Sequence, residues 1–266
     1  MTATRVEPAL VLKPDGIATG ERTVAVEAPV AIEVDGLGYA VMMMTPADLE
    51  AFATGFMLTE RLVDSAADVV AVEPFEAEAG WIVRVVLSDR CRGRIHDRVR
   101  HRTSDTSCGL CGIASLEQLR RPVAARPSRP EITPAALFAA MAALRAHQPL
   151  NGITGAAHAA AACDAEGHII AVFEDVGRHN ALDKLVGATA LADARPAFLL
   201  VTSRISFEMV DKTLVAGVPL LAGISAPTSL AIDHAREHGL TLVALARPDA
   251  MLAMNDPWNV FAAGKD

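Results

Sequence analysis

The chain has 266 residues, of which 52% are hydrophobic and 21% are charged, and its formal net charge is −8. This apolar content excludes a disordered chain, and four cysteines are too few for a small fold held together by disulfides. The acidic balance argues against general nucleic-acid binding. The N-terminus lacks an apolar run of signal-peptide length, and Pro219 and Pro227 interrupt the uncharged stretch 213–232. We therefore expect a cytoplasmic protein with reduced thiols and no membrane segment.

The first part of the chain predicts a small α+β unit. Short β-rich runs predict strands at 23–26, 30–34, 39–44, 69–72 and 81–87. Asp35-Gly36 is a hairpin turn signal between the second and third of these runs. Thr45-Pro46 predicts the start of a helix, with Thr45 as its cap and an apolar face that continues to about Leu62.

An arginine-rich stretch follows, from Arg84 to Arg102, with seven arginines against two aspartates. Most charge runs are solvated faces, and this one is expected to be a strand whose alternate residues point outward. The functional alternative is a basic lip for an anionic ligand or a protein partner. DNA binding is not expected, because the run is short and the whole chain is acidic. A linker rich in Pro and Arg is expected at 120–130.

The second half alternates between helical and strand patterns. Helices are expected at 134–145, 179–192, 207–216 and 227–238, and strands at 156–163, 168–174, 197–202, 219–224 and 240–245. This alternation predicts a largely parallel sheet covered by helices on both faces. With the linker between the two patterns, we expect an N-terminal α+β domain, residues 1–125, and a C-terminal α/β domain, residues 126–266.

The sharpest local motif is Cys108-Gly109-Leu110-Cys111-Gly112. Two thiols three positions apart, with glycines beside them and arginines upstream, suit sulfur transfer or disulfide exchange. A structural zinc site would need two more ligands, and the remaining candidates, Cys91 and Cys163 among them, are scattered. A thioredoxin-like pair should follow a strand of a redox domain. The spacing alone leaves zinc binding, sulfur chemistry and ordinary loop cysteines open.

Three further loops each follow a predicted strand and open a helix, at 174–180, 203–206 and 225–229. Ligands collect at the carboxyl ends of strands in open α/β sheets, and helix N-termini favour anions, so these loops predict a phosphate-bearing ligand. The alternative is simple helix capping by Asp175, Ser203, Ser206 and Ser225. Neither glycine-rich nucleotide fingerprint is present. We expect His158 and His179 to pack or to hydrogen-bond rather than to bind a ligand.

Five segments together carry a family resemblance: Ser107–Gly112, Thr154–Ala160, Glu174–Lys184, Ser206–Val210 and Ser225–Ser229, in this order. The set resembles the FdhD family of formate dehydrogenase accessory proteins, which are sulfur carriers, and the resemblance runs from about Thr23 to the C-terminus. It implies a small, roll-like α+β domain followed by a three-layer α/β domain similar to cytidine deaminase. The deaminase zinc signature is absent, so deaminase activity is not implied.

The resemblance also implies a function. Such proteins are sulfurtransferases that accept persulfide sulfur from a cysteine desulfurase. They pass it to the molybdenum or tungsten bis-molybdopterin guanine dinucleotide cofactor, which formate dehydrogenase requires. Cys108 corresponds to the persulfide cysteine and Cys111 to its partner thiol. The cofactor is thus a substrate, and neither a permanent cofactor nor a bound metal is expected.

The resemblance places the binding site of the guanine dinucleotide near the C-terminus. The corresponding segment is Trp258-Asn259-Val260-Phe261-Ala262-Ala263, in which Phe261 replaces the tyrosine often found in the family. A homodimer is expected from the high apolar fraction. Two alternatives are a chaperone that holds the cofactor without sulfur transfer and a zinc-binding protein that uses Cys108 and Cys111.

Overall fold

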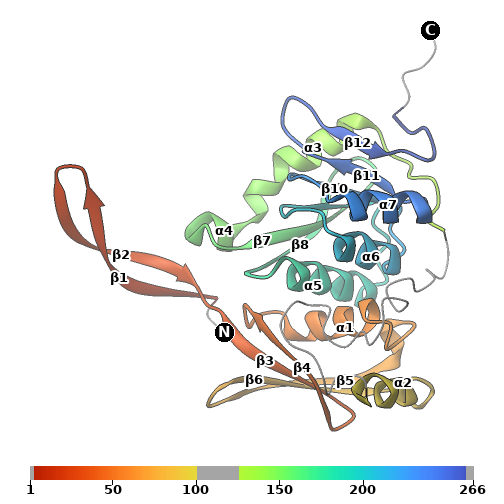
Figure 1. The fold of residues 1–266 in the computed structure, drawn as a ribbon, viewed down its shortest axis with the longest axis horizontal. Helices are drawn as coiled ribbons and strands as arrows, with labels where there is room; N and C mark the ends of the chain where they lie inside the picture. Colours follow the sequence, from red (N-terminus) through yellow and green to blue (C-terminus); the bar gives the residue numbers. More distant parts are fainter. Residues whose placement is uncertain (1–2, 101–125, 262–266) are drawn as a thin grey trace.

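The computed structural model describes residues 3–100 and 126–261. The predicted sulfur site, Cys108 and Cys111, lies outside the described residues, as do Ala262 and Ala263. In the described part of the chain, a four-stranded sheet and a six-stranded sheet lie on either side of a pair of packed helices, and a two-stranded ribbon projects from them (Figure 1).

The four-stranded sheet comes from the first part of the chain. Its strands are β3 (Ala28–Val34), β4 (Leu37–Met44), β5 (Val69–Ala77) and β6 (Gly80–Leu87), in the order β4-β3-β6-β5. The predicted hairpin turn at Asp35-Gly36 is confirmed by the antiparallel pairing of β3 with β4. Val30, Ile32 and Val34 alternate along β3 and are fully buried, because they face helix α1 (Leu49–Thr59).

Two predictions about this part of the chain are wrong. Helix α1 begins at Leu49 with Asp48 at its N-cap, so Thr45 does not cap it. The reason is that the backbone and hydroxyl groups of Thr45 bond to residues far along the chain. The arginine-rich stretch is a strand only as far as Leu87 and then forms helix α2 (Asp89–Arg100). There Cys91 and Ile95, four residues apart, are both fully buried, as a helix requires.

The six-stranded sheet comes from the second part of the chain. Its strands are β7 (His158–Cys163), β8 (Ile169–Asp175), β9 (Phe198–Val201), β10 (Leu220–Gly223), β11 (Thr241–Ala244) and β12 (Leu252–Asn255), in the order β12-β11-β10-β9-β7-β8. Only the neighbouring pairs β9–β10 and β10–β11 are parallel, whereas the pairs β11–β12, β9–β7 and β7–β8 are antiparallel, so the prediction of a largely parallel sheet is wrong. Strands β7 and β8 form a hairpin across a short turn, and only antiparallel strands can be joined in that way.

Helices cover both faces of this sheet, as predicted (Figure 1). They are α3 (Pro134–Leu144) on one face and α5 (Arg178–Leu191), α6 (Phe207–Val215) and α7 (Ser229–His238) on the other. Thr133 caps α3 by accepting a hydrogen bond from the backbone amide of Ala136, which confirms the predicted start of that helix. The uncharged stretch 213–232 spans the end of α6, strand β10 and the start of α7, in agreement with the predicted helix and strand ranges.

Helices α1 and α5 hold the two parts together through backbone contact. A Cβ atom added to Gly55 of α1 would lie 1.8 Å from the carbonyl oxygen of Asp183, and one added to Gly187 of α5 would lie 1.8 Å from that of Ala51. Only glycine permits this approach. Beside the crossing, Lys212 donates hydrogen bonds of 2.8 Å to both carboxylate oxygens of Asp183 in the buried core.

The sequence did not predict several elements. These are β1 (Thr4–Lys13), most of β2 (Gly16–Ala25), α4 (Pro149–Thr154) and β12. Strands β1 and β2 form the projecting ribbon and expose Leu10, Leu12 and Ile17 (Figure 1). Within the described ranges, no helix is both long and apolar enough to cross a membrane. The expected domain boundary between residues 125 and 126 stays a prediction.

Candidate functional site

The topology brings the three predicted loops to one edge of the six-stranded sheet. Strands β8, β9 and β10 end there and β7 begins there, so residues 175–179, 202–206 and 224–228 lie together; we call this the loop edge. Two of the loops are directly bonded, because Ile205 donates its amide to Ala226 (3.2 Å) and accepts from the amide of Thr228 (3.0 Å). The N-termini of α5, α6 and α7 all start from this edge.

The floor of the loop edge is a buried ion pair. Lys184 Nζ lies 2.7 Å from Asp175 Oδ2, and both side chains are fully buried. Asp175 also accepts hydrogen bonds from the amides of Thr45 (3.1 Å) and Gly177 (2.8 Å) and from the side chain of Asn180 (3.1 Å). The predicted capping role of Asp175 is wrong, because Gly177 occupies the N-cap of α5, no side chain caps this helix, and the bond from the Gly177 amide lies before its first turn. Because Thr45 belongs to the first part of the chain, the pair also fixes the loop edge against that part.

Above this floor lie two arginines that have no carboxylate partner among the described residues. Arg178 opens α5, and its Nε atom is buried without a hydrogen-bond partner. Arg204 lies in the loop after β9 and is exposed. Burial, with the nearby charges of Arg178 and Arg204, lowers the pKa of His158 at the start of β7. The edge therefore carries positive charge from the arginines and a neutral imidazole at pH 7.

His179, the second residue of α5, is also held neutral. Its pKa is lowered to about 4, mainly by burial and then by the positive charges of Arg178 and Lys212. Its Nε2 atom is buried without a hydrogen-bond partner, and the nearest carboxylate oxygen, on Glu208, lies 4.0 Å away. That distance is too long for a hydrogen bond. The expectation that His179 packs or hydrogen-bonds is met by packing: its side chain is largely buried, and within the described part of the chain it makes no hydrogen bond.

Helix capping explains only part of the loop edge. Thr228, not Ser225, caps α7, and Ser203 bonds to the carbonyl of its neighbour. Ser206 occupies the N-cap position of α6 without capping it, and its hydroxyl instead interacts with the Glu208 carboxylate; the Oδ1 atom of Asn180 is buried and unpartnered. Buried polar atoms normally have partners. A bound polar group at this edge would supply the missing ones.

The predicted guanine-binding segment lies at the other edge of the sheet. Strand β12 is antiparallel to β11, so the residues after Asn255 emerge where β11 begins. Asp256 accepts hydrogen bonds of 2.9 Å from the amides of Val260 and Phe261, and the Phe261 ring packs against the core under α3. The Arg126 guanidinium lies 5.5 Å from the centre of the Trp258 ring. We call residues 256–261 the C-terminal edge; the structure does not bring it to the loop edge.

The described cysteines are far from reactive. Cys91 is buried in the core of the four-stranded sheet and Cys163 in the core beneath α3, so folding does not gather them into one site. Burial raises the pKa of Cys163 to about 12. A thiol with so high a pKa is not a nucleophile at neutral pH.

From Arg84 to Arg94, the arginine-rich stretch does not offer the unbalanced positive charge that the alternative of a basic lip requires. Its side chains pair with carboxylates instead: Arg84 with Glu33, Arg90 with Asp68, Arg92 with Asp35 and Asp89, and Arg94 with Asp64. The carboxylates come largely from neighbouring elements, so the positive charge that is dense in the sequence is balanced in the structure.

Comparisons with known proteins agree on one family. The model of the FdhD/NarQ family matches residues 25–260. Proteins named "Sulfur carrier protein FdhD" from Bordetella petrii and Agrobacterium fabrum are 46% and 47% identical to this chain, over 87% and 86% of it and 84% and 86% of their own lengths. A solved structure named as a formate dehydrogenase accessory protein from Desulfotalea psychrophila is 25% identical. It covers 97% of this chain and 99% of its own, with a TM-score of 0.75.

Proposed function

We propose that this chain, which belongs to the FdhD/NarQ family, is a sulfur carrier that serves formate dehydrogenase. In this proposal it takes persulfide sulfur from a cysteine desulfurase and passes it to the bis-molybdopterin guanine dinucleotide cofactor. The observation that carries the proposal is the near full-length match, at about 45% identity, to relatives named as sulfur carriers. The name of the similar protein from Desulfotalea psychrophila connects that protein with formate dehydrogenase.

Sulfur is loaded on Cys108 in this proposal. The Cys108 thiolate attacks the outer sulfur of the desulfurase persulfide, a new S–S bond forms, and the desulfurase cysteine leaves as a thiolate. The exchange needs no external oxidant or reductant. Among the chain's four cysteines, the burial of Cys91 and Cys163 leaves Cys108 and Cys111 as the pair available for this chemistry.

The anionic part of the cofactor binds at the loop edge in this proposal. Phosphate oxygens would accept hydrogen bonds from Arg178 and Arg204 and would meet the N-termini of α5, α6 and α7. The neutral imidazole of His179 has a buried nitrogen without a partner, which a polar ligand could satisfy. These unpartnered groups distinguish the loop edge from an ordinary set of helix caps.

The segment from Trp258 to Ala263 remains the proposed contact for guanine. Trp258 Nε1 is a buried donor without a partner, and Arg126 lies against its ring. Because the C-terminal edge and the loop edge lie at opposite ends of the strands, substitutions can test the two separately.

The proposal is tested by maturation of formate dehydrogenase in cells that produce variants of this chain. Cys108→Ser is expected to abolish formate dehydrogenase activity, because a hydroxyl cannot carry a persulfide. Cys163→Ala is the matched control, since it removes a buried thiol outside the proposed site, and it should keep activity. Wild-type activity with the double variant Cys108→Ser/Cys111→Ser would refute sulfur transfer and favour a chaperone that only holds the cofactor.

A further inference from the structure

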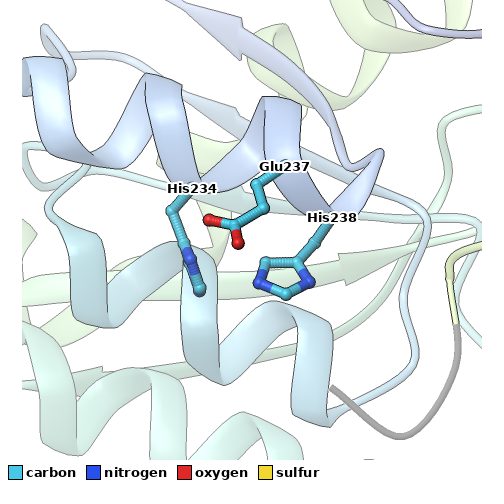
Figure 2. Close-up of side chains that lie close together, drawn as sticks. All are labelled: His234, Glu237 and His238. Carbon is cyan, nitrogen blue, oxygen red and sulfur yellow. The ribbon is translucent and has the colours of Figure 1, made fainter. Parts of the chain in front are cut away.

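A second group of ligand-type side chains lies near the end of α7. His234 and His238 are four residues apart and therefore share one face of the helix, with Glu237 beside them. One nitrogen from each ring and one oxygen of the carboxylate all lie within 4.8 Å of one another. Figure 2 shows the carboxylate of Glu237 directed toward the space between the two imidazole rings.

Two other groups of this kind occur among the described residues, and neither resembles it. They are Asp64 with Asp68 and Cys91, and Asp164 with Glu166 and His168. In the first group, arginines of α2 already pair with both carboxylates. In the second group, the Nδ1 atom of the single imidazole, that of His168, lies 2.9 Å from Oδ2 of Asp164. Of these three groups, only the one on α7 offers two imidazoles.

The ring of His234 is held in a fixed orientation. The side chain is 6% exposed, and the ring centre of Phe207 lies 4.3 Å from its own. Its Nε2 atom lies 3.3 Å from the carboxylate of Asp211. Both carboxylate oxygens of Asp211 also accept hydrogen bonds of 2.8 Å from the Arg61 guanidinium. Donation from Nε2 to this carboxylate corresponds to the tautomer whose lone pair is on Nδ1. A carboxylate behind a ligating histidine is the usual outer shell of a metal site.

The electrostatics around the second ring also favour a cation. The ring centres of His234 and His238 lie 4.6 Å apart, so nitrogens of both rings border the same space. Asp211 and Glu237 contribute two negative charges near the rings, against the one positive charge of Arg61. Two imidazoles and one carboxylate suit zinc, cobalt or nickel rather than magnesium or calcium.

We propose that His234, Glu237 and His238 bind one divalent transition-metal ion, with a fourth position open to water or another ligand. Bonds of roughly 2.0–2.1 Å to zinc require ligand atoms about 3.3 Å apart, so the group must contract slightly on binding. Glu237 is exposed, so rotation of its side chain can bring the carboxylate closer to the two rings. The site uses neither cysteine of the sulfur-carrier proposal, so the two proposals can fail independently.

The test is a zinc titration of the full-length, metal-stripped chain against a chromophoric chelator. We expect one ion per chain, and at least about tenfold weaker binding in both His238→Ala and Glu237→Gln, because even outer-shell substitutions weaken metal sites 10–100-fold. His168→Ala is the matched control and should bind as the wild type does. Cobalt should give visible absorption bands without thiolate charge transfer.

Three outcomes would overturn this site. They are absence of zinc binding by the wild type, unchanged affinity in both α7 variants, and loss of binding in Cys108→Ser/Cys111→Ser, which would place the metal on the cysteine pair. Circular dichroism shows whether each variant is folded. Glu237→Gln serves as the second variant because it changes an exposed side chain without changing its shape.

Discussion

The molecule contains two sets of arginines that differ in their partners. The set on β6 and α2 is dense in the sequence, and four of its members pair with carboxylates: Arg84, Arg90, Arg92 and Arg94. The set at the loop edge consists of two arginines from separate segments, Arg178 and Arg204, and no described carboxylate pairs with either. An anion competes with a paired carboxylate at the first set, whereas at the second the carboxylate that interacts with Arg178, Glu208, forms no ion pair with it.

The difference shows that charge density along a chain does not locate an anion site. A paired surface arginine contributes little beyond its ion pair, because its charge is balanced and screened. An arginine with a buried, unpartnered nitrogen retains hydrogen-bonding capacity for a ligand. The loop edge should therefore respond to substitution through binding, and the α2 set only weakly and through stability.

The largest expected effect is a loss of stability when the buried ion pair between Asp175 and Lys184 is broken. Lys184→Met should lower the free energy of unfolding by roughly 3–5 kcal/mol, because it leaves the fully buried Asp175 carboxylate without its cation. Denaturant unfolding measures the change. The double variant Asp175→Asn/Lys184→Met removes both charges and should recover part of the loss. A change below about 1 kcal/mol in Lys184→Met would contradict the role given to this pair.

The next effect is on phosphate binding. Arg178→Ala should weaken binding of pyrophosphate, used as the probe, by roughly 10- to 100-fold, since it removes charge-assisted hydrogen bonds worth about 1.5–3 kcal/mol. Isothermal titration at fixed salt measures the affinity, with Arg94→Ala as the matched control that should bind normally. If Trp258→Ala abolishes pyrophosphate binding and Arg178→Ala does not, the phosphate site belongs at the C-terminal edge instead.

A smaller effect is a pH dependence of stability. The pKa of His179 is about 4 in the folded chain, below its unfolded value near 6.5, so the unfolded state binds the proton more tightly. The contribution of His179 is thus complete above pH 6.5 and is lost as the pH falls toward 4. Between pH 7 and pH 5, the wild type should lose about 1–2 kcal/mol more stability than His179→Gln. Equal losses in the two proteins would show that His179 does not titrate in this way.

The smallest expected effect is the change in stability when one ion pair of the α2 arginines is removed. Arg94→Ala removes an exposed ion pair with Asp64 and should change the free energy of unfolding by less than about 1 kcal/mol. Thermal unfolding measures this change. A loss comparable with that of Lys184→Met would mean that the α2 pairs are structural anchors.

Local patterns in the sequence predicted most elements of the fold. The hairpin at Asp35-Gly36, the helix start at Pro134 and the apolar runs of the second half each depend on neighbouring residues, and the structure confirms them. The direction of the strands, by contrast, depends on which strands pair. The local sequence made Thr45 look like a helix cap. Its actual partner, Asp175, lies 130 positions away and is not visible in a local pattern. The helical spacing of Cys91 and Ile95 was a usable signal for α2, but the arginines around them obscured it.

For the candidate site, too, only the features that depend on neighbouring residues could be predicted. The three loops at strand ends could be identified from the sequence because strand–loop–helix order is local, and the structure brings them to one edge. Which arginines lack partners could not be predicted, since pairing depends on the assembled fold. The same holds for the separation of the loop edge from Trp258, which follows from the antiparallel return of β12.

The most direct test of the sulfur-carrier proposal is mass spectrometry of the chain after incubation with a cysteine desulfurase and cysteine. The proposal predicts an added mass of about 32 Da, one sulfur atom, on the peptide that contains Cys108, and its removal by a thiol reductant. Peptides with Cys91 and Cys163 should stay unmodified, because both thiols are buried. An unmodified Cys108 in a chain that still activates formate dehydrogenase would contradict the proposal.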